Sequence, residues 1–183
     1  DAHSVYGNGV GGWRTYVTSS TDAPAKIDAK EIIRNAKAGR LILTTGPFLE
    51  VTANGALPGS DITAKNGNVK LKVKVQCTDW VEIDRVQVLV NGRQIPELNI
   101  TAMKNPKMFK SAPNVFETTF NVDLEKDAHL IVVAMGENHD LKTGYGTSAN
   151  ANLNPCAYIN PIWVDVDGNG FQPNKDTLGW PLP

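Results

Sequence analysis

The chain has 183 residues, of which 41% are hydrophobic and 20% charged, which is enough for one well-packed domain and too little for two large ones. Its longest purely apolar run, Leu130 to Met135, is far shorter than the ~20 residues of a membrane-spanning helix, so no membrane span is expected. The 18 basic and 19 acidic residues give a formal net charge of −1, which lacks the positive surface that nucleic acids and anionic membranes attract, and neither is predicted as a partner.

The first part of the chain differs in composition from the rest. Residues 1–26 are rich in Gly, Ser and Thr and have no sustained hydrophobic period, which predicts an irregular arm. A short helix is predicted over 28–38. Asp28 and Glu31 have the spacing of a capping box, and Gly39 stands where a helix commonly ends.

Beyond the helix the hydrophobic period changes to two. In Val69–Cys77, apolar residues alternate with lysine or glutamine, the pattern of a strand with one buried and one solvent-facing side. Asn91-Gly92 tolerates positive φ and predicts a tight hairpin turn. Further strands are expected over 41–45, 48–52, 86–90, 93–95, 116–122, 130–135 and 158–166. Residues 27–183 are therefore predicted to form one all-β domain, an immunoglobulin-like two-sheet β-sandwich with one short N-terminal helix.

The segment after the last strand matches a calcium-loop pattern. Side-chain oxygens stand at positions 1, 3 and 5 (Asp165, Asp167 and Asn169), the Phe171 carbonyl stands at position 7 and Asp176 at position 12. Calcium binds several oxygens of one tight loop, and glycine at position 6 permits the sharp turn. Against this, position 12 is Asp rather than Glu, and an Asp/Gly/Asn turn after a strand explains the same letters. A calcium site over 165–176 and a plain turn both remain open.

A second metal-binding pattern stands at the first three residues. Asp1-Ala2-His3 places a carboxylate and an imidazole two residues apart, which suits one metal ion if the backbone is extended and other ligands converge on it. Two ligands alone do not hold a catalytic metal ion. His129 and His139 have no partner at ligand spacing that would complete such a site.

Short segments along nearly the whole chain carry a likeness to a known enzyme family. They are Asp1-Ala2-His3, Trp13–Val17, Ala38-Gly39-Arg40, Thr44–Phe48, Asn54–Gly59, Val86–Arg93 and Asn160–Asp165. Through them the chain resembles the C-terminal portion of PHP (polymerase and histidinol phosphatase) metallohydrolases, in the branch similar to carbaryl hydrolase.

This resemblance implies a parent enzyme with a barrel of β and α units, which binds two or three divalent metal ions and hydrolyses an ester, amide or phosphoester bond with metal-activated water. Asp1 and His3 would be remnant ligands of that site, and residues 1–26 a remnant of the hydrolase domain. The other ligands would belong to the missing N-terminal hydrolase domain, the expected partner. The resemblance therefore implies a non-catalytic accessory β-sandwich that supports this barrel.

The alternative is a stand-alone module that binds glycans or a cell-surface partner and that calcium could stabilise. Sugars pack on exposed aromatic rings; Trp180 is the better exposed candidate, whereas Trp163 stands among apolar strand residues and is expected to be buried. A self-contained enzyme ranks last, because the sequence has no nucleophile elbow, P-loop or zinc-type HxxxH motif. Cys77 and Cys156 could be two thiols or one disulfide, and the compartment is undecided.

Overall fold

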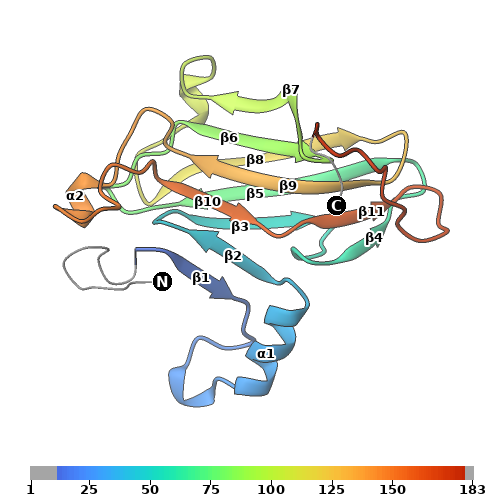
Figure 1. Ribbon diagram of the computed structural model, residues 1–183, viewed down its shortest axis with the longest axis horizontal. Helices are drawn as coiled ribbons and strands as arrows, with labels where there is room; N and C mark the ends of the chain where they lie inside the picture. Colours follow the sequence, from blue (N-terminus) through green and yellow to red (C-terminus); the bar gives the residue numbers. More distant parts are fainter. Residues whose placement is uncertain (1–11, 180–183) are drawn as a thin grey trace.

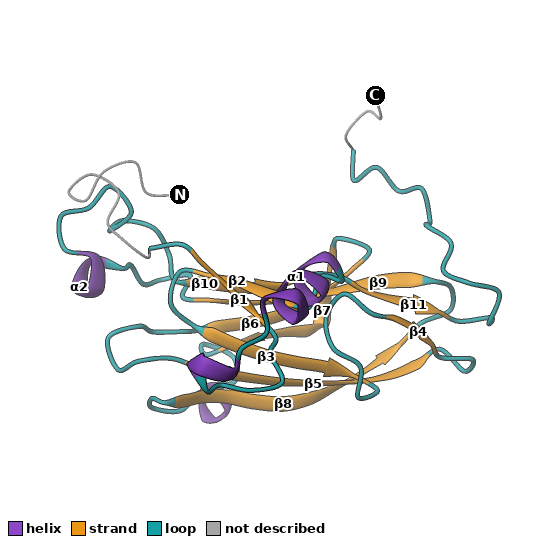
Figure 2. Cartoon of the chain, turned by 90° about the horizontal axis from the view of Figure 1, so that it is seen from below, coloured by secondary structure: helices purple, strands orange, loops and turns teal. Residues whose placement is uncertain are grey.

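The computed structural model describes residues 12–179, which fold into two β-sheets packed face to face (Figure 1, Figure 2). The larger sheet contains β1 (Arg14–Val17), β2 (Leu41–Thr44), β4 (Asp61–Thr63), β6 (Arg85–Val90), β7 (Arg93–Thr101), β9 (Ala128–Met135), β10 (Cys156–Ile159) and β11 (Ile162–Asp165). The smaller sheet contains β3 (Phe48–Ala53), β5 (Asn68–Gln76) and β8 (Asn114–Asp123). The helices are α1 (Ala29–Lys37) and α2 (Lys142–Tyr145), and 3₁₀ turns lie at Pro24–Lys26 and Pro106–Met108. The predicted all-β, two-sheet sandwich with a short N-terminal helix is confirmed.

β9 is the central strand of the larger sheet. One of its edges pairs with β6, which also pairs with β7. Its other edge pairs first with β10 and then with β11. The strand predicted over 158–166 is therefore two strands, because the Asn160-Pro161 step interrupts it and proline has no N–H to donate to a ladder. β2 and β1 continue the sheet beyond β10, and β4 lies parallel beside β11.

The core fills the space between the two sheets. On the smaller sheet, Leu49, Leu71, Val73 and Phe116 are fully or almost fully buried, and on the larger sheet Val86, Val88, Leu130 and Val132 are fully buried. The period-two pattern of β5 is confirmed, because its valines and leucine are buried while the intervening Lys70 and Lys72 are exposed. Burial of the alternate apolar residues is what selects this register, since a slip by one residue would turn every lysine inward.

The helix lies beside β1 and β2 at one margin of the sandwich (Figure 1). The Asp28 carboxylate accepts a hydrogen bond of 2.9 Å from the Lys30 N–H, which confirms the predicted N-cap. The reciprocal half of the predicted capping box is wrong. The Glu31 carboxylate instead accepts hydrogen bonds of 2.8 and 2.9 Å from the N–H and hydroxyl of Ser20, because the preceding segment folds back against the helix. Neither helix of the described part of the chain is long and apolar enough to cross a membrane.

The prediction of an irregular arm over 1–26 is wrong for part of its length. Residues 14–17 form β1 and pair with β2 from Arg14↔Thr44 to Val17↔Leu41. A four-residue strand carries too short a pattern for a period to be visible, and it is held in place by the neighbouring strand rather than by its own sequence. The arm is therefore joined to the sandwich as a strand at the margin of the larger sheet.

Candidate metal centre

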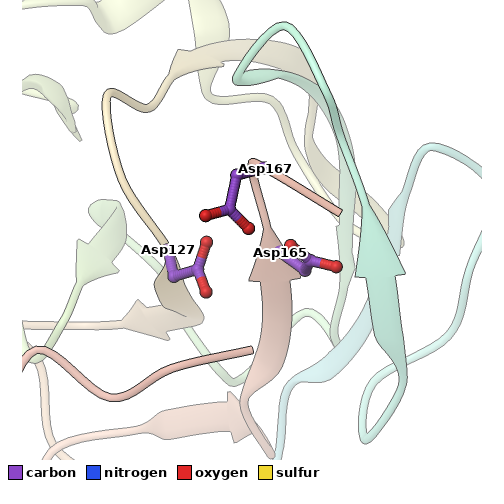
Figure 3. Close-up of side chains that lie close together, drawn as sticks. All are labelled: Asp127, Asp165 and Asp167. Atoms are coloured by element: carbon purple, nitrogen blue, oxygen red, sulfur yellow. The ribbon is translucent and has the colours of Figure 1, made fainter. Parts of the chain in front are cut away.

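Three aspartates meet at the end of the sandwich where β9 begins and β11 ends (Figure 3). Asp127 immediately precedes β9, Asp165 is the last residue of β11, and Asp167 lies in the turn after it. One carboxylate oxygen of each lies within 4.8 Å of one of each of the others. We call these three residues the aspartate cluster.

The pairing of β9 with β11 explains the meeting. The register places Val164 opposite Ala128 in an antiparallel pair, so the next step along both strands brings Asp165 level with Asp127. Asp167 then joins them because the chain turns back sharply. Gly168 and Gly170 both have positive φ, of 86° and 97°, a conformation that glycine adopts without strain.

Backbone N–H groups donate to all three carboxylates, and Asp167 accepts from the N–H of Asn169 at 3.1 Å. Asp165 accepts hydrogen bonds from the N–H groups of Gly168 at 2.7 Å and Gly170 at 3.0 Å. Asp127 accepts from the N–H groups of Val166 at 2.8 Å and Gln172 at 2.7 Å. The loop over 166–172 is therefore wrapped around the carboxylates.

The surroundings of Asp165 favour its negative charge. Burial of Asp165 raises its pKa, but the hydrogen bonds from Gly168 and Gly170 outweigh burial and bring the pKa below its ordinary value. Among residues 12–179, no lysine or arginine forms an ion pair with the three carboxylates. Carboxylate oxygens are the ligands that Ca²⁺ and Mg²⁺ prefer. The cluster can therefore offer at least three oxygen ligands to a hard divalent cation.

The structure brings together only part of the predicted calcium loop. Asp165 and Asp167 meet as expected, whereas the amide nitrogen of Asn169 donates to Asp167 at 2.7 Å. Phe171 lies in the same loop, half-buried, between Gly170 and Gln172.

The structure does not bring Asp176 to this cluster. Its two oxygens accept hydrogen bonds of 2.6 and 2.9 Å from the Arg93 guanidinium on β7. The hydrogen bond from Arg93 is the main cause of the lowered pKa of Asp176. The C-terminal segment extends to the β6–β7 hairpin and carries Asp176 with it, instead of closing a twelve-residue loop.

Asp127 replaces Asp176 as the third carboxylate, and the sequence reasoning missed it. It is 38 residues from Asp165, in a turn before an apolar strand, and no motif links the two positions. The signal that would find it is the pairing of β9 with β11, which is a tertiary property.

Three other predicted residues, Asp1, His3 and Trp180, lie outside the described residues. The imidazole of His139 lies 3.3 Å from Glu82 and 3.7 Å from Asp84, each measured from a different ring nitrogen. Trp163, predicted to be buried, is half-buried, because its side chain alternates away from the core between Ile162 and Val164.

Both cysteines are free thiols. Burial, with a further contribution from the charge of Glu82, raises the pKa of Cys77 to about 11, and its thiol lies 3.0 Å from the Val81 carbonyl oxygen. Burial also raises the pKa of Cys156. Thiolates are the reactive form of cysteine, so these environments suppress rather than promote nucleophilic chemistry.

A second surface lies at the margin of the sandwich where α1 also lies, between β1 and β2 of the larger sheet and β3 of the smaller one. A pocket of about 440 Å³ opens there, lined by apolar side chains that include Ile42, Leu49 and Val51. At its rim the rings of Tyr16 and Phe48 meet edge to face, with centroids 5.3 Å apart. We call this surface the aromatic margin.

Comparison of the chain with family models, curated proteins and solved structures found no match. The function therefore has to be argued from the aspartate cluster, the aromatic margin and the rest of the molecular surface.

Proposed function

We propose that this chain is a non-catalytic accessory β-sandwich that packs against a metal-dependent hydrolase domain of the same protein, the arrangement implied by its resemblance to PHP-type metallohydrolases. The observation that carries the proposal is the aromatic margin. Tyr16 is 40% exposed and Phe48 36%. Two large, partly exposed rings in contact beside an apolar pocket form the kind of patch that marks an interaction site.

The position of the margin supports a domain partner. β1 ends the larger sheet on this side, and β3 ends the smaller sheet, so the sandwich is open between them. Edge strands present unpaired backbone groups that proteins commonly cover. β1 is also the first described strand, so a domain that precedes it in the same protein would be tethered beside this margin.

The direct test is association of the 183-residue chain with the separately produced domain encoded before it. Tyr16→Ser combined with Phe48→Ser should weaken binding at least ~10-fold, because buried aromatic anchors carry much of the energy of an interface. Met103→Ser is the matched control, since Met103 is 88% exposed on the loop after β7, away from the margin. Equal binding by both variants contradicts the proposal, and so does metal-dependent hydrolysis of ester or phosphoester substrates by the chain alone.

We further propose that the aspartate cluster binds a divalent cation, with Ca²⁺ preferred because its coordination tolerates irregular loops. The supporting observation is the convergence of three carboxylates that form no ion pair with a lysine or arginine within residues 12–179. A cation there would join the loop after β11 to the start of β9. The test is thermal unfolding in calcium and in a chelator; equal melting temperatures would remove the proposal.

A further inference from the structure

The outer face of the larger sheet, which points away from the core, is apolar in its middle (Figure 2). Val133 of β9 pairs with Tyr158 of β10, and Tyr158 pairs with Leu43 of β2. The residues on either side of Val133 are buried in the core, so Val133 and its partners point outward. The same alternation assigns the remaining members of a group that we call the outer apolar face: Leu43, Leu89, Ile131, Val133, Tyr158 and Trp163.

β9 has the sequence of a strand that is covered on both faces. Leu130 to Met135 is an uninterrupted apolar run, whereas a strand with one solvent-facing side alternates apolar and polar residues, as β5 does. Within residues 12–179 only the inner face of β9 is covered, and Ile131 and Val133 on its outer face are half-buried. Helix α1 lies beside β1 at the margin, and α2 lies beyond one end of the sheet (Figure 1). The run therefore indicates a cover that the described residues do not supply.

The outer face of the smaller sheet shows how this protein builds a surface for water. Lys70 and Lys72 of β5 are exposed on it, and Lys74 forms an ion pair of 3.1 Å with Glu50 of β3. The outer apolar face has no charged member, and Tyr158 in its middle is 37% exposed. Contiguous apolar surface of this kind marks an interaction site. The two outer faces of the sandwich are thus suited to different surroundings.

Charged residues stand at two opposite corners of the outer apolar face. Arg85 of β6 pairs with Met135 at the end of β9. Asp61 of β4 pairs with Trp163, which pairs with His129 near the start of β9. Burial lowers the pKa of His129, so this imidazole adds no charge at neutral pH. A two-fold axis between two copies of the face can bring Arg85 of one copy to Asp61 of the other, so the face is complementary to itself in charge.

The outer apolar face is large enough for a weak dimer. β2, β10 with β11, β9 and β6 occupy four neighbouring strand positions, and β9 is eight residues long. At about 4.8 Å per strand and about 3.4 Å per residue, these strands span roughly 500 Å². Two copies would bury about 1,000 Å², which is the lower limit of a specific interface.

We infer that the outer apolar face is the interface of a symmetric dimer, in which the larger sheets of two copies stack face to face. Sheets pack in this way about 10 Å apart, with their facing side chains interdigitated. Each copy uses the same face, so association closes at two copies. An interface of this size should have a Kd of about 1–100 μM. The inference concerns a different surface from the aromatic margin and does not rest on the proposed function.

The test is sedimentation-velocity ultracentrifugation of the 183-residue chain from about 1 to about 500 μM. Conversion from monomer to dimer is expected across this range. In ¹H–¹⁵N NMR spectra over the same range, the backbone signals of β2, β9 and β10 should shift with concentration, while those of β8 stay fixed. A chain that stays monomeric throughout overturns the inference, and so does a dimer whose shifting signals lie on the smaller sheet.

Variants locate the interface. Val133→Lys should abolish the dimer, because its charge would be buried without a partner between the sheets. In the monomer this lysine points to water, as the lysines of β5 do, so the fold should persist, and urea unfolding checks this. Tyr158→Ser, a milder change on the adjacent strand, should weaken the dimer about 10-fold. Thr119→Lys adds the same charge to the exposed face of β8 and should leave the dimer intact. Equal self-association by Val133→Lys and Thr119→Lys contradicts the inference.

Discussion

The interior of the sandwich and the aspartate cluster shift the pKa of a buried group in opposite directions. In the interior, burial raises the pKa of Cys77 to about 11 and keeps the thiol neutral. At the cluster, Asp165 is also buried, yet its pKa falls below the ordinary value because the N–H groups of Gly168 and Gly170 donate to it. Burial by itself therefore does not decide the direction of a pKa shift. At Asp165 the hydrogen bonds that reach the charged carboxylate outweigh it.

The two regions also differ in how they are built. The interior consists of alternate residues of long strands, so each strand contributes several interchangeable apolar side chains. The cluster depends on three particular side chains at one end of the β9–β11 strand pair. We therefore expect the interior to dominate stability and the cluster to dominate the response to ions and pH.

The largest effect should follow removal of a large side chain from the interior. Leu71 is fully buried on β5, and Leu71→Ala should lower the free energy of unfolding by about 2–5 kcal/mol, because it leaves a cavity between the sheets. Urea unfolding measures this loss. Lys72→Ala, on the exposed face of the same strand, should change it by less than about 0.5 kcal/mol. Similar losses in both variants would mean that the core does not lie between the sheets.

The next largest effect is expected from calcium binding to the aspartate cluster. Calcium at 100 times its dissociation constant should raise the free energy of unfolding by about 2.7 kcal/mol, because it binds only the folded state. Asp127→Asn should abolish this increase, since it removes a charged ligand contributed by the start of β9. Asp123→Asn changes an exposed carboxylate at the end of β8 and should leave the increase intact. An equal calcium response in both variants would exclude the cluster as the site.

The raised pKa of Cys77 predicts low reactivity. With a pKa of about 11, the thiolate fraction at about pH 8 is roughly 100-fold below that of a thiol with its ordinary pKa. Alkylation by iodoacetamide should be slowed by about the same factor relative to a cysteine-containing peptide, with mass spectrometry of the digested chain reporting Cys77 separately from Cys156. Labelling at the peptide rate would show that the interior is not closed around this thiol.

Acid should weaken the cluster before it affects the interior. The pKa of Asp165 in the folded chain lies below its ordinary value of 3.8, so its contribution to stability is present above that value and is lost as the pH falls through the folded pKa. Asp140 and Asp176 also have lowered pKa values and add to the same acid sensitivity.

The contribution of Asp165 is isolated by comparing the parent chain with Asp165→Asn in urea at neutral pH and at about pH 2. The difference in stability between the two should be larger at neutral pH. A difference that is the same at both pH values would show that the Asp165 charge is not stabilised by the loop.

The smallest effect is expected at Asp176. Its carboxylate binds Arg93 at an exposed position, where an ion pair contributes little, and it lies outside the aspartate cluster. Asp176→Asn should therefore leave the calcium-induced rise in melting temperature unchanged. If the rise is lost, Asp176 is a calcium ligand, and the site is the twelve-residue loop over 165–176 rather than the aspartate cluster.

Features that depend on neighbouring residues were readable from the sequence. The alternation in Val69–Cys77 predicted which face of β5 is buried, because successive side chains of a strand point to opposite sides. The N-cap at Asp28 was predicted, and Asn91-Gly92 forms the tight turn with φ values of 51° and 76°. Each of these follows from the chemistry of a few consecutive residues.

Features that depend on distant partners were decided only by the tertiary structure. Asp127 joins Asp165 through the register of β9 with β11, and Asp176 is drawn to Arg93 rather than to its own loop. Likewise, Glu31 binds Ser20, and residues 14–17 become a strand because β2 lies beside them. Local sequence patterns specify the direction and burial of a strand's side chains. They carry no information on which strand pairs with which. The pairing of β9 with β11 is what assembles the aspartate cluster.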